Sequence, residues 1–223
     1  MIERALDLGL ARIGFSDHSY VAFDAGYCMP ADTFAYRQEI RALADEYRGR
    51  IKVLCGIEQD ILSPAPDDSY DYIIGSVHYV SSGGRNIAID DTVEDFECAA
   101  RELCGGDYLA LAEQYFETVA RVVDVTGADI VGHFDLIKKF NVQERYFDES
   151  APRYVRAWKA AADALVKTGA VFEVNYGGMW SGRRSEPYLT EEMQNYVRER
   201  GATVIASSDA HEPKALASFL WLK

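Results

Sequence analysis

The feature that most constrains the fold is a unit that recurs five times: a helix-like stretch, a glycine and a short apolar run. Glycine just past a helix end is a common cap, because it accepts the left-handed backbone that ends the helix. The five glycines are Gly9, Gly49, Gly127, Gly169 and Gly201. The apolar runs after them are rich in Ile and Val and mostly do not alternate with polar residues. That pattern is typical of parallel strands buried on both faces, so the repeats predict a parallel sheet.

The stretches between the runs are predicted to be helices that cover this sheet. Apolar residues three and four positions apart give each of them one apolar face. These segments are residues 31–47, 108–125, 152–167 and 190–200. A sixth apolar run, residues 70–80, is expected to pair in the same sheet. Alternating strands and helices predict an α/β fold with parallel strands, here a closed TIM-like barrel in a single domain over residues 1–223.

Ligand-type side chains lie at one end of every predicted strand. All four histidines of the chain lie at or just past the carboxyl end of an apolar run: His18, His78, His133 and His211. A fifth run ends in Glu58, and a sixth carries Glu173 and Asn175. In β/α barrels the active site is built at the carboxyl ends of the strands. We therefore expect these side chains to meet at one rim.

Histidine and carboxylate together point to a metal site at that rim. Asp209 and His211 are two residues apart, so both can project to the same side of an extended chain. This mixture of ligands suits Zn, Mn or Fe, and ligands from several strands favour two or more ions, with Glu58 as a bridge. A single histidine at a strand end is more often a hydrogen-bonded rim residue, and Asp209 alone could cap a helix. That alternative would have to hold for all four histidines at once.

Composition limits the kinds of partner and the cellular compartment that we expect for this chain. The net charge is −13 and no basic run occurs, which argues against nucleic acid as a partner. A small anionic substrate is compatible with this charge if metal ions supply local positive charge. No apolar run of about 18 residues predicts a membrane span, and the first residues lack the apolar centre of a signal peptide. The four cysteines form no CxxC pair, so a reduced, cytoplasmic protein is expected.

The strand-end motifs resemble those of the polymerase and histidinol phosphatase (PHP) superfamily, in particular its bacterial histidinol-phosphatase branch. Six motifs occur in the family's order: FSDHS, GIEQD, GSVHY, GHFD, FEVN and SSDAH. The resemblance implies a distorted (βα)7 barrel with a trinuclear metal cluster. It also implies a phosphatase that hydrolyses L-histidinol phosphate in histidine biosynthesis.

The resemblance also assigns roles to residues. Glu58 resembles the bridging carboxylate, and His78 and His133 resemble the ligands that complete one metal site with it. Asp209 resembles a ligand of a second site, and His18 and His211 resemble ligands of a third. The catalytic residues implied are Glu58, Asp209 and His211. The loop from Asn175 to Arg184 resembles the family's substrate-binding loop, with Asn175, Arg183 and Arg184 as candidates and Arg183 preferred.

The chain departs from the family pattern at both ends. It has no counterpart of the family's first strand with its HxH motif, nor of the family's last helix. Three alternatives would each account for these differences: a misassigned start, a truncation or a natural loss. A barrel without its first strand has two open sheet edges, which makes a homo-oligomer a candidate assembly. The alternatives to histidinol phosphate hydrolysis are hydrolysis of another small phosphate, such as a nucleotide, and a catalytically impaired metal-binding remnant.

Overall fold

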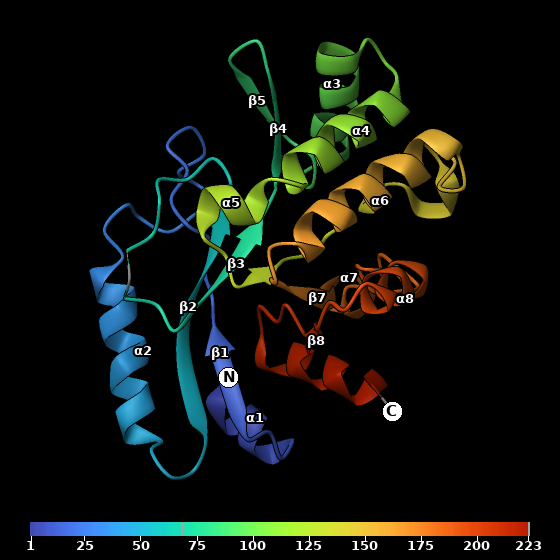
Figure 1. Cartoon of the computed structure of the whole chain (residues 1–223). Coiled ribbons are helices and arrows are strands. Elements are labelled where there is room, and N and C mark those ends of the chain that lie inside the picture. Colours follow the sequence, from blue (N-terminus) through green and yellow to red (C-terminus); the bar gives the residue numbers. More distant parts are fainter. Residues whose placement is uncertain (68, 223) are drawn as a thin grey trace.

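The computed structural model describes residues 1–67 and 69–222, with side chains to residue 217. Its main feature is a curled sheet of six parallel strands in the order β1-β2-β3-β6-β7-β8 (Figure 1). The strands are β1 (Arg12–Phe15), β2 (Lys52–Asp60), β3 (Tyr72–Ser76), β6 (Ile130–Val131), β7 (Val171–Asn175) and β8 (Val204–Ser207). Each comes from one of the six apolar runs, so the predicted parallel sheet is confirmed.

The predicted helices are present, and the predicted segment 108–125 is divided in two. The helices are α1 (Ile2–Asp7), α2 (Phe34–Glu46), α4 (Tyr108–Val119), α5 (Val122–Thr126), α6 (Pro152–Val166), α7 (Gly177–Trp180) and α8 (Glu191–Glu199). Short 3-10 helices are η1 (Leu136–Lys138), η2 (Val142–Glu144) and η3 (Pro213–Leu222). The break after Val119 follows Thr118, whose hydroxyl donates to the carbonyl of Gln114, a contact that bends helices. All five glycines of the repeated unit have positive φ, between 68° and 87°.

An antiparallel hairpin and a helix follow β3 and were not predicted. The hairpin joins β4 (Tyr79–Ser82) to β5 (Arg85–Ala88), and α3 (Val93–Cys104) comes next. Its two-residue turn is Gly83–Gly84, both at positive φ, as a tight hairpin turn requires. Thr92 begins α3 by accepting a hydrogen bond from the backbone N–H of Asp95. Both signals are local, so they were available in the sequence.

Two apolar cores hold the helices against the sheet. The larger one packs α4 and α6 together and buries Tyr115, Tyr154 and Trp158. The smaller one joins α1, β1, β2 and η3 through Ile2, Ile13 and Leu216. Strands β1 and β8 are the two edges of the parallel sheet, and η3 packs on α1 beside β1 (Figure 1). The sheet is therefore barrel-like, with a break in its hydrogen bonding between β1 and β8 among the described residues.

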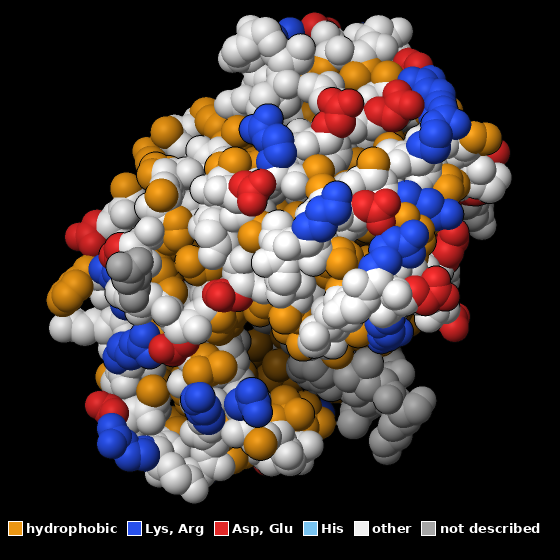
Figure 2. Space-filling model, in the orientation of Figure 1, with side chains coloured by type: hydrophobic (Ala, Val, Ile, Leu, Met, Phe, Trp, Pro, Cys, Tyr) orange, Lys and Arg blue, Asp and Glu red, His pale blue; other side chains and the backbone are white. Residues whose placement is uncertain are grey.

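The visible face of the molecule carries side chains of both charges (Figure 2). On the face shown in Figure 2, Lys and Arg side chains are interspersed with Asp and Glu, without a continuous basic patch. No helix in the described part of the chain has the length and apolar character needed to cross a membrane.

Candidate metal centre and active site

Three neighbouring strands bring the central residues of the site together. Glu58 lies near the end of β2, His78 follows β3, and His133 follows β6. The segment before Ser19 continues alongside β2: the N–H of Glu58 donates to Asp17 (3.0 Å), and the N–H of Ser19 donates to Glu58 (2.8 Å). Because adjacent parallel strands end at the same rim, these side chains converge as predicted.

Glu58 is the centre of this group of histidines. Its Oε1 lies 2.9 Å from His133 Nε2 and 3.2 Å from His78 Nε2, and its Oε2 lies 3.7 Å from His18 Nδ1. Burial would raise the pKa of Glu58, but the charge of His18 and hydrogen bonds from His133 and His78 hold it well below its ordinary value. The carboxylate is therefore kept ionised in a buried position.

The donor set fits a divalent metal ion. One ligand atom each from His18, Glu58 and His78 lie within 4.8 Å of one another, and His133 touches the same carboxylate. The other ring nitrogen of His133, Nδ1, is buried without a hydrogen-bond partner among the described residues. Imidazole and carboxylate are the ligands of catalytic zinc sites. The prediction that these residues meet at a site fit for metal is supported by this geometry.

His78 is oriented by a carboxylate that the sequence reading missed. Asp60 Oδ2 accepts from His78 Nδ1 (3.1 Å) and from the backbone N–H of His78 (3.0 Å), which leaves Nε2 facing Glu58. Burial alone would lower the pKa of His78, but hydrogen bonds to Asp60 and Glu58 raise it well above its ordinary value. The signal for Asp60 was its position two residues after Glu58, on the same face of β2.

Asp209 reaches the same pocket from the end of β8. Asn175 donates from Nδ2 to Asp209 Oδ2 (3.2 Å) and to Glu173 Oε2 (3.1 Å). Its amide is thus engaged in holding these acids, and the residue does not line the pocket. Asp209 has φ of 46°, a left-handed conformation that non-glycine residues rarely adopt. The backbone at this position is therefore held in place by its surroundings.

His211 lies at the rim rather than inside. Its side chain is 76% exposed, and its Nδ1 lies 3.0 Å from the carbonyl oxygen of Asp209. Its ring centroid is 6.5 Å from that of His18. The structure therefore groups His18 with Glu58 and His78, and places His211 beside that group.

The two candidate arginines have different environments. Arg183 lines the pocket, whereas Arg184 does not. The Arg184 guanidinium is buried, donating to the carbonyl of Lys138 (2.8 Å) and to Glu186 (3.2 Å). Arg184 thus fastens its loop, and Arg183 is the residue of the pair that lines the pocket.

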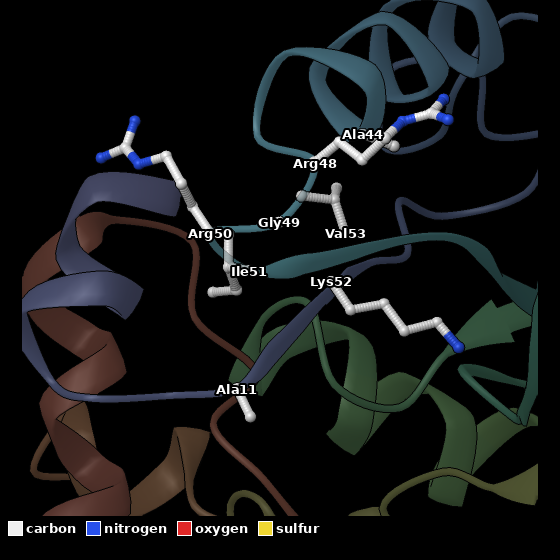
Figure 3. A pocket seen from close by; sticks show the side chains of 8 residues that line it. All are labelled: Ala11, Ala44, Arg48, Gly49, Arg50, Ile51, Lys52 and Val53. Carbon is white, nitrogen blue, oxygen red and sulfur yellow. The ribbon is translucent and has the colours of Figure 1, made fainter.

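The site opens into a pocket of about 240 Å³ that is lined by all six predicted metal ligands. A larger pocket of about 410 Å³ lies at the amino ends of β1 and β2, lined by Ala11, Ala44 and residues 48–53. Its cationic side chains, Arg48, Arg50 and Lys52, point away from one another (Figure 3). They do not converge on a ligand, so the smaller pocket is the candidate active site.

Comparison with known proteins gives a consistent picture. The family model of the PHP domain matches residues 1–177. A probable histidinol-phosphatase of Deinococcus radiodurans is 30% identical over 223 residues, covering 95% of this chain and 78% of its own. The histidinol-phosphatase of Bacillus subtilis is 25% identical over 235 residues, covering 94% and 85%.

Two solved structures have a similar fold. The putative histidinol phosphatase of Listeria monocytogenes matches with a TM-score of 0.82 at 16% identity, covering 97% of this chain and 89% of that one. The histidinol phosphate phosphatase of Lactococcus lactis, solved with zinc, L-histidinol and phosphate, matches with a TM-score of 0.68 at 18% identity, covering 99% and 84%.

Proposed function

Since the chain belongs to the PHP domain family, we propose that it is a metal-dependent phosphatase that hydrolyses L-histidinol phosphate to L-histidinol and phosphate. The observation that carries this proposal is the buried Glu58 carboxylate with three imidazoles around it at the strand ends. Relatives named as histidinol-phosphatases support the substrate. The reaction places the protein in histidine biosynthesis, and its substrate is a small phosphorylated molecule.

We propose that His18, Glu58, His78, His133, Asp209 and His211 hold two or three divalent ions, Zn, Mn or Fe. A divalent ion held by these residues would lower the pKa of a bound water molecule toward neutrality and would offset phosphoryl charge. The mixed histidine and carboxylate donors and the unpartnered Nδ1 of His133 support this set.

The chain's own residues position the substrate around this centre. Arg183 is proposed to bind the phosphate through its guanidinium, which suits two phosphate oxygens at once. Asn175 holds Asp209 through Oδ2, and Oδ1, which lies 3.8 Å from His211 Nδ1, is the oxygen proposed to orient the attacking water. Arg184 keeps the loop of Arg183 in place through Glu186 and Lys138. Glu58, Asp209 and His211 are the proposed catalytic residues.

For the fold, we propose the family's distorted (βα)7 barrel, with the first strand corresponding to the space between β1 and β8. Both strands are sheet edges. Ile205 of β8 pairs with the buried Glu173, yet the residue is 39% exposed. An exposed apolar residue beside an unpaired edge is where another strand would pack. The same edges are the proposed contact of a homo-oligomer.

The test of the proposed function is Glu58→Gln, which keeps the shape of the side chain and removes its charge. We expect metal content per chain and phosphate release from L-histidinol phosphate to fall together. Elemental mass spectrometry and a phosphate assay measure the two quantities. Glu39→Gln, a change of the same kind on the exposed face of α2, should leave both unchanged. Retention of metal and activity by Glu58→Gln would contradict the proposal.

A second candidate, a catalytically impaired metal-binding protein, is favoured by the exposure of His211. It predicts bound metal without turnover of any ester. A panel of phosphate esters that includes nucleotides separates it from a phosphatase with another small substrate, because that enzyme would prefer a different member of the panel.

A further inference from the structure

A buried carboxylate that has no role in the proposed hydrolysis lies in the wall of the active-site pocket. Asp90 is only 4% exposed, and it lines the same pocket as Glu58. The hairpin of β4 and β5 brings it there: Tyr79 pairs with Ala88, and the N–H of Ile89 donates to the carbonyl of His78 (2.9 Å). The chain thus returns at residue 90 to the neighbourhood of His78.

One carboxylate oxygen of Asp90 has a side-chain partner, Lys139. Lys139 Nζ lies 3.1 Å from Asp90 Oδ2, and Lys139 also lines the pocket. Within the described part of the chain, the side-chain hydrogen bonds of Asp90 involve Oδ2 alone. An ionised carboxylate offers about four acceptor positions on its two oxygens. The ion pair with Lys139 makes the buried charge tolerable and leaves acceptor capacity for a ligand.

The pocket has walls beyond the predicted metal ligands. Leu136, Tyr27 and Tyr188 line it as well as Asp90 and Lys139, together with the loop residues Gly177, Gly178, Ser181 and Arg183. Burial, and after it the charge of Asp90, raise the pKa of Tyr27, so the carboxylate acts directly on this wall. A phosphate held by the proposed metal ions and Arg183 would leave the alcohol half of an ester to fill the rest of the pocket.

We propose that Asp90 is the specificity residue that selects phosphate esters whose alcohol half carries an ammonium group. The inference rests on the proposed function, because it requires a phosphate ester in this pocket. The ammonium group donates a charge-assisted hydrogen bond to the free acceptor side of Asp90. An ester without a cation leaves the buried carboxylate without that donor, and a site built for a hydrogen bond rejects a ligand that lacks it.

The test compares two esters on the metal-loaded protein. L-Histidinol phosphate carries an ammonium group, and p-nitrophenyl phosphate does not. The kcat/KM values are measured for the unmutated protein, for Asp90→Asn and for Asp91→Asn, an exposed neighbour with the same change of charge. We expect Asp90→Asn to lower the ratio of kcat/KM for the two esters by about 10- to 100-fold, the range of a charge-assisted bond in a desolvated site. Asp91→Asn should leave the ratio unchanged.

A second measurement needs no variant. L-Histidinol and the same alcohol without its amino group are compared as competitive inhibitors of the unmutated protein, and the first should bind at least about 10-fold more tightly. Equal inhibition, or an unchanged ratio in a folded Asp90→Asn protein, would overturn the role of Asp90 while hydrolysis itself persists. Failure to hydrolyse either ester would instead overturn the proposed function, and this proposal with it.

Discussion

The site has an inner half on β2, β3 and β6 and an outer half at the end of β8, and the two are built differently. In the inner half, Glu58, His78 and His133 are all buried. In the outer half, the His211 side chain is mostly in solvent, and Asp209 belongs to a loop that follows an edge strand. Both halves supply metal-type ligands, but only the inner one is enclosed.

The difference lies in the support behind each ligand. Ser76 donates to Glu58 (2.7 Å), and Asp60 fixes His78 through two hydrogen bonds. In the outer half, Asn175 supports Asp209 from β7, but His211 is tied to the carbonyl of Asp209 in its own loop, which restricts it much less. Partners that orient ligands tune a metal site nearly as strongly as the ligands do. We therefore expect the inner half to dominate metal affinity.

The largest test of this comparison removes one histidine from each half. His78→Ala should weaken metal binding by more than about 100-fold, beyond the range for loss of a supporting partner. His211→Ala should weaken metal binding by less than about 10-fold, because the exposed ring of His211 is only weakly restrained. Metal titration followed by calorimetry measures both. Similar losses in the two variants would show that the halves contribute equally.

The next test leaves the ligands in place and removes the support. Asp60→Asn keeps the size of the side chain but weakens its hold on His78, so we expect a loss of about 10- to 100-fold in metal affinity. Asp7→Asn, on the exposed surface of α1, is the matched control and should have no effect. If Asp60→Asn bound metal as tightly as the unmutated protein, His78 would be positioned by packing alone.

The buried histidines of the inner half also predict two opposite effects of pH. As pH rises, the metal-free protein should lose stability, whereas the affinity for metal should increase. In the metal-free protein, burial would lower the pKa of His78 and of His133, but hydrogen bonds to carboxylates raise both. A raised pKa contributes stability below the unfolded value of about 6.5, and this contribution disappears as pH rises through the folded value. Metal binding requires the neutral imidazoles, so affinity should rise over the same range.

Melting temperatures measured with a chelator and with added zinc, from pH 6 upward, test this directly. The stabilisation by zinc should increase with pH, while the metal-free protein should lose stability. The same dependence in His78→Ala would mean that other groups cause it.

Much of this organisation could be predicted from local patterns, and the exceptions have physical causes. The apolar runs and their glycines determine the strands, and the position of each histidine after a strand places it at the rim. The environments of Arg183 and Arg184 could not be distinguished, because burial of Arg184 depends on Glu186 and on the carbonyl of Lys138, which the fold brings together. The hairpin before Asp90 was missed although its Gly83–Gly84 turn is a local signal.

The smallest expected effect concerns the packing of Tyr72 against Gly56 in β2, the strand that carries Glu58. A Cβ at Gly56 would overlap the ring of Tyr72 on the neighbouring strand β3, so Gly56→Ala must displace this half-buried aromatic side chain. Overpacking of this kind costs about 1–3 kcal/mol of unfolding free energy. Gly26→Ala, with no other atom within 4 Å of the added carbon, should change it by less than about 0.5 kcal/mol. Urea unfolding of both variants measures the difference. If Gly56→Ala were as stable as Gly26→Ala, the packing of Tyr72 against β2 would adapt easily to an added methyl group. Tight packing around the inner half could then not explain its higher expected metal affinity.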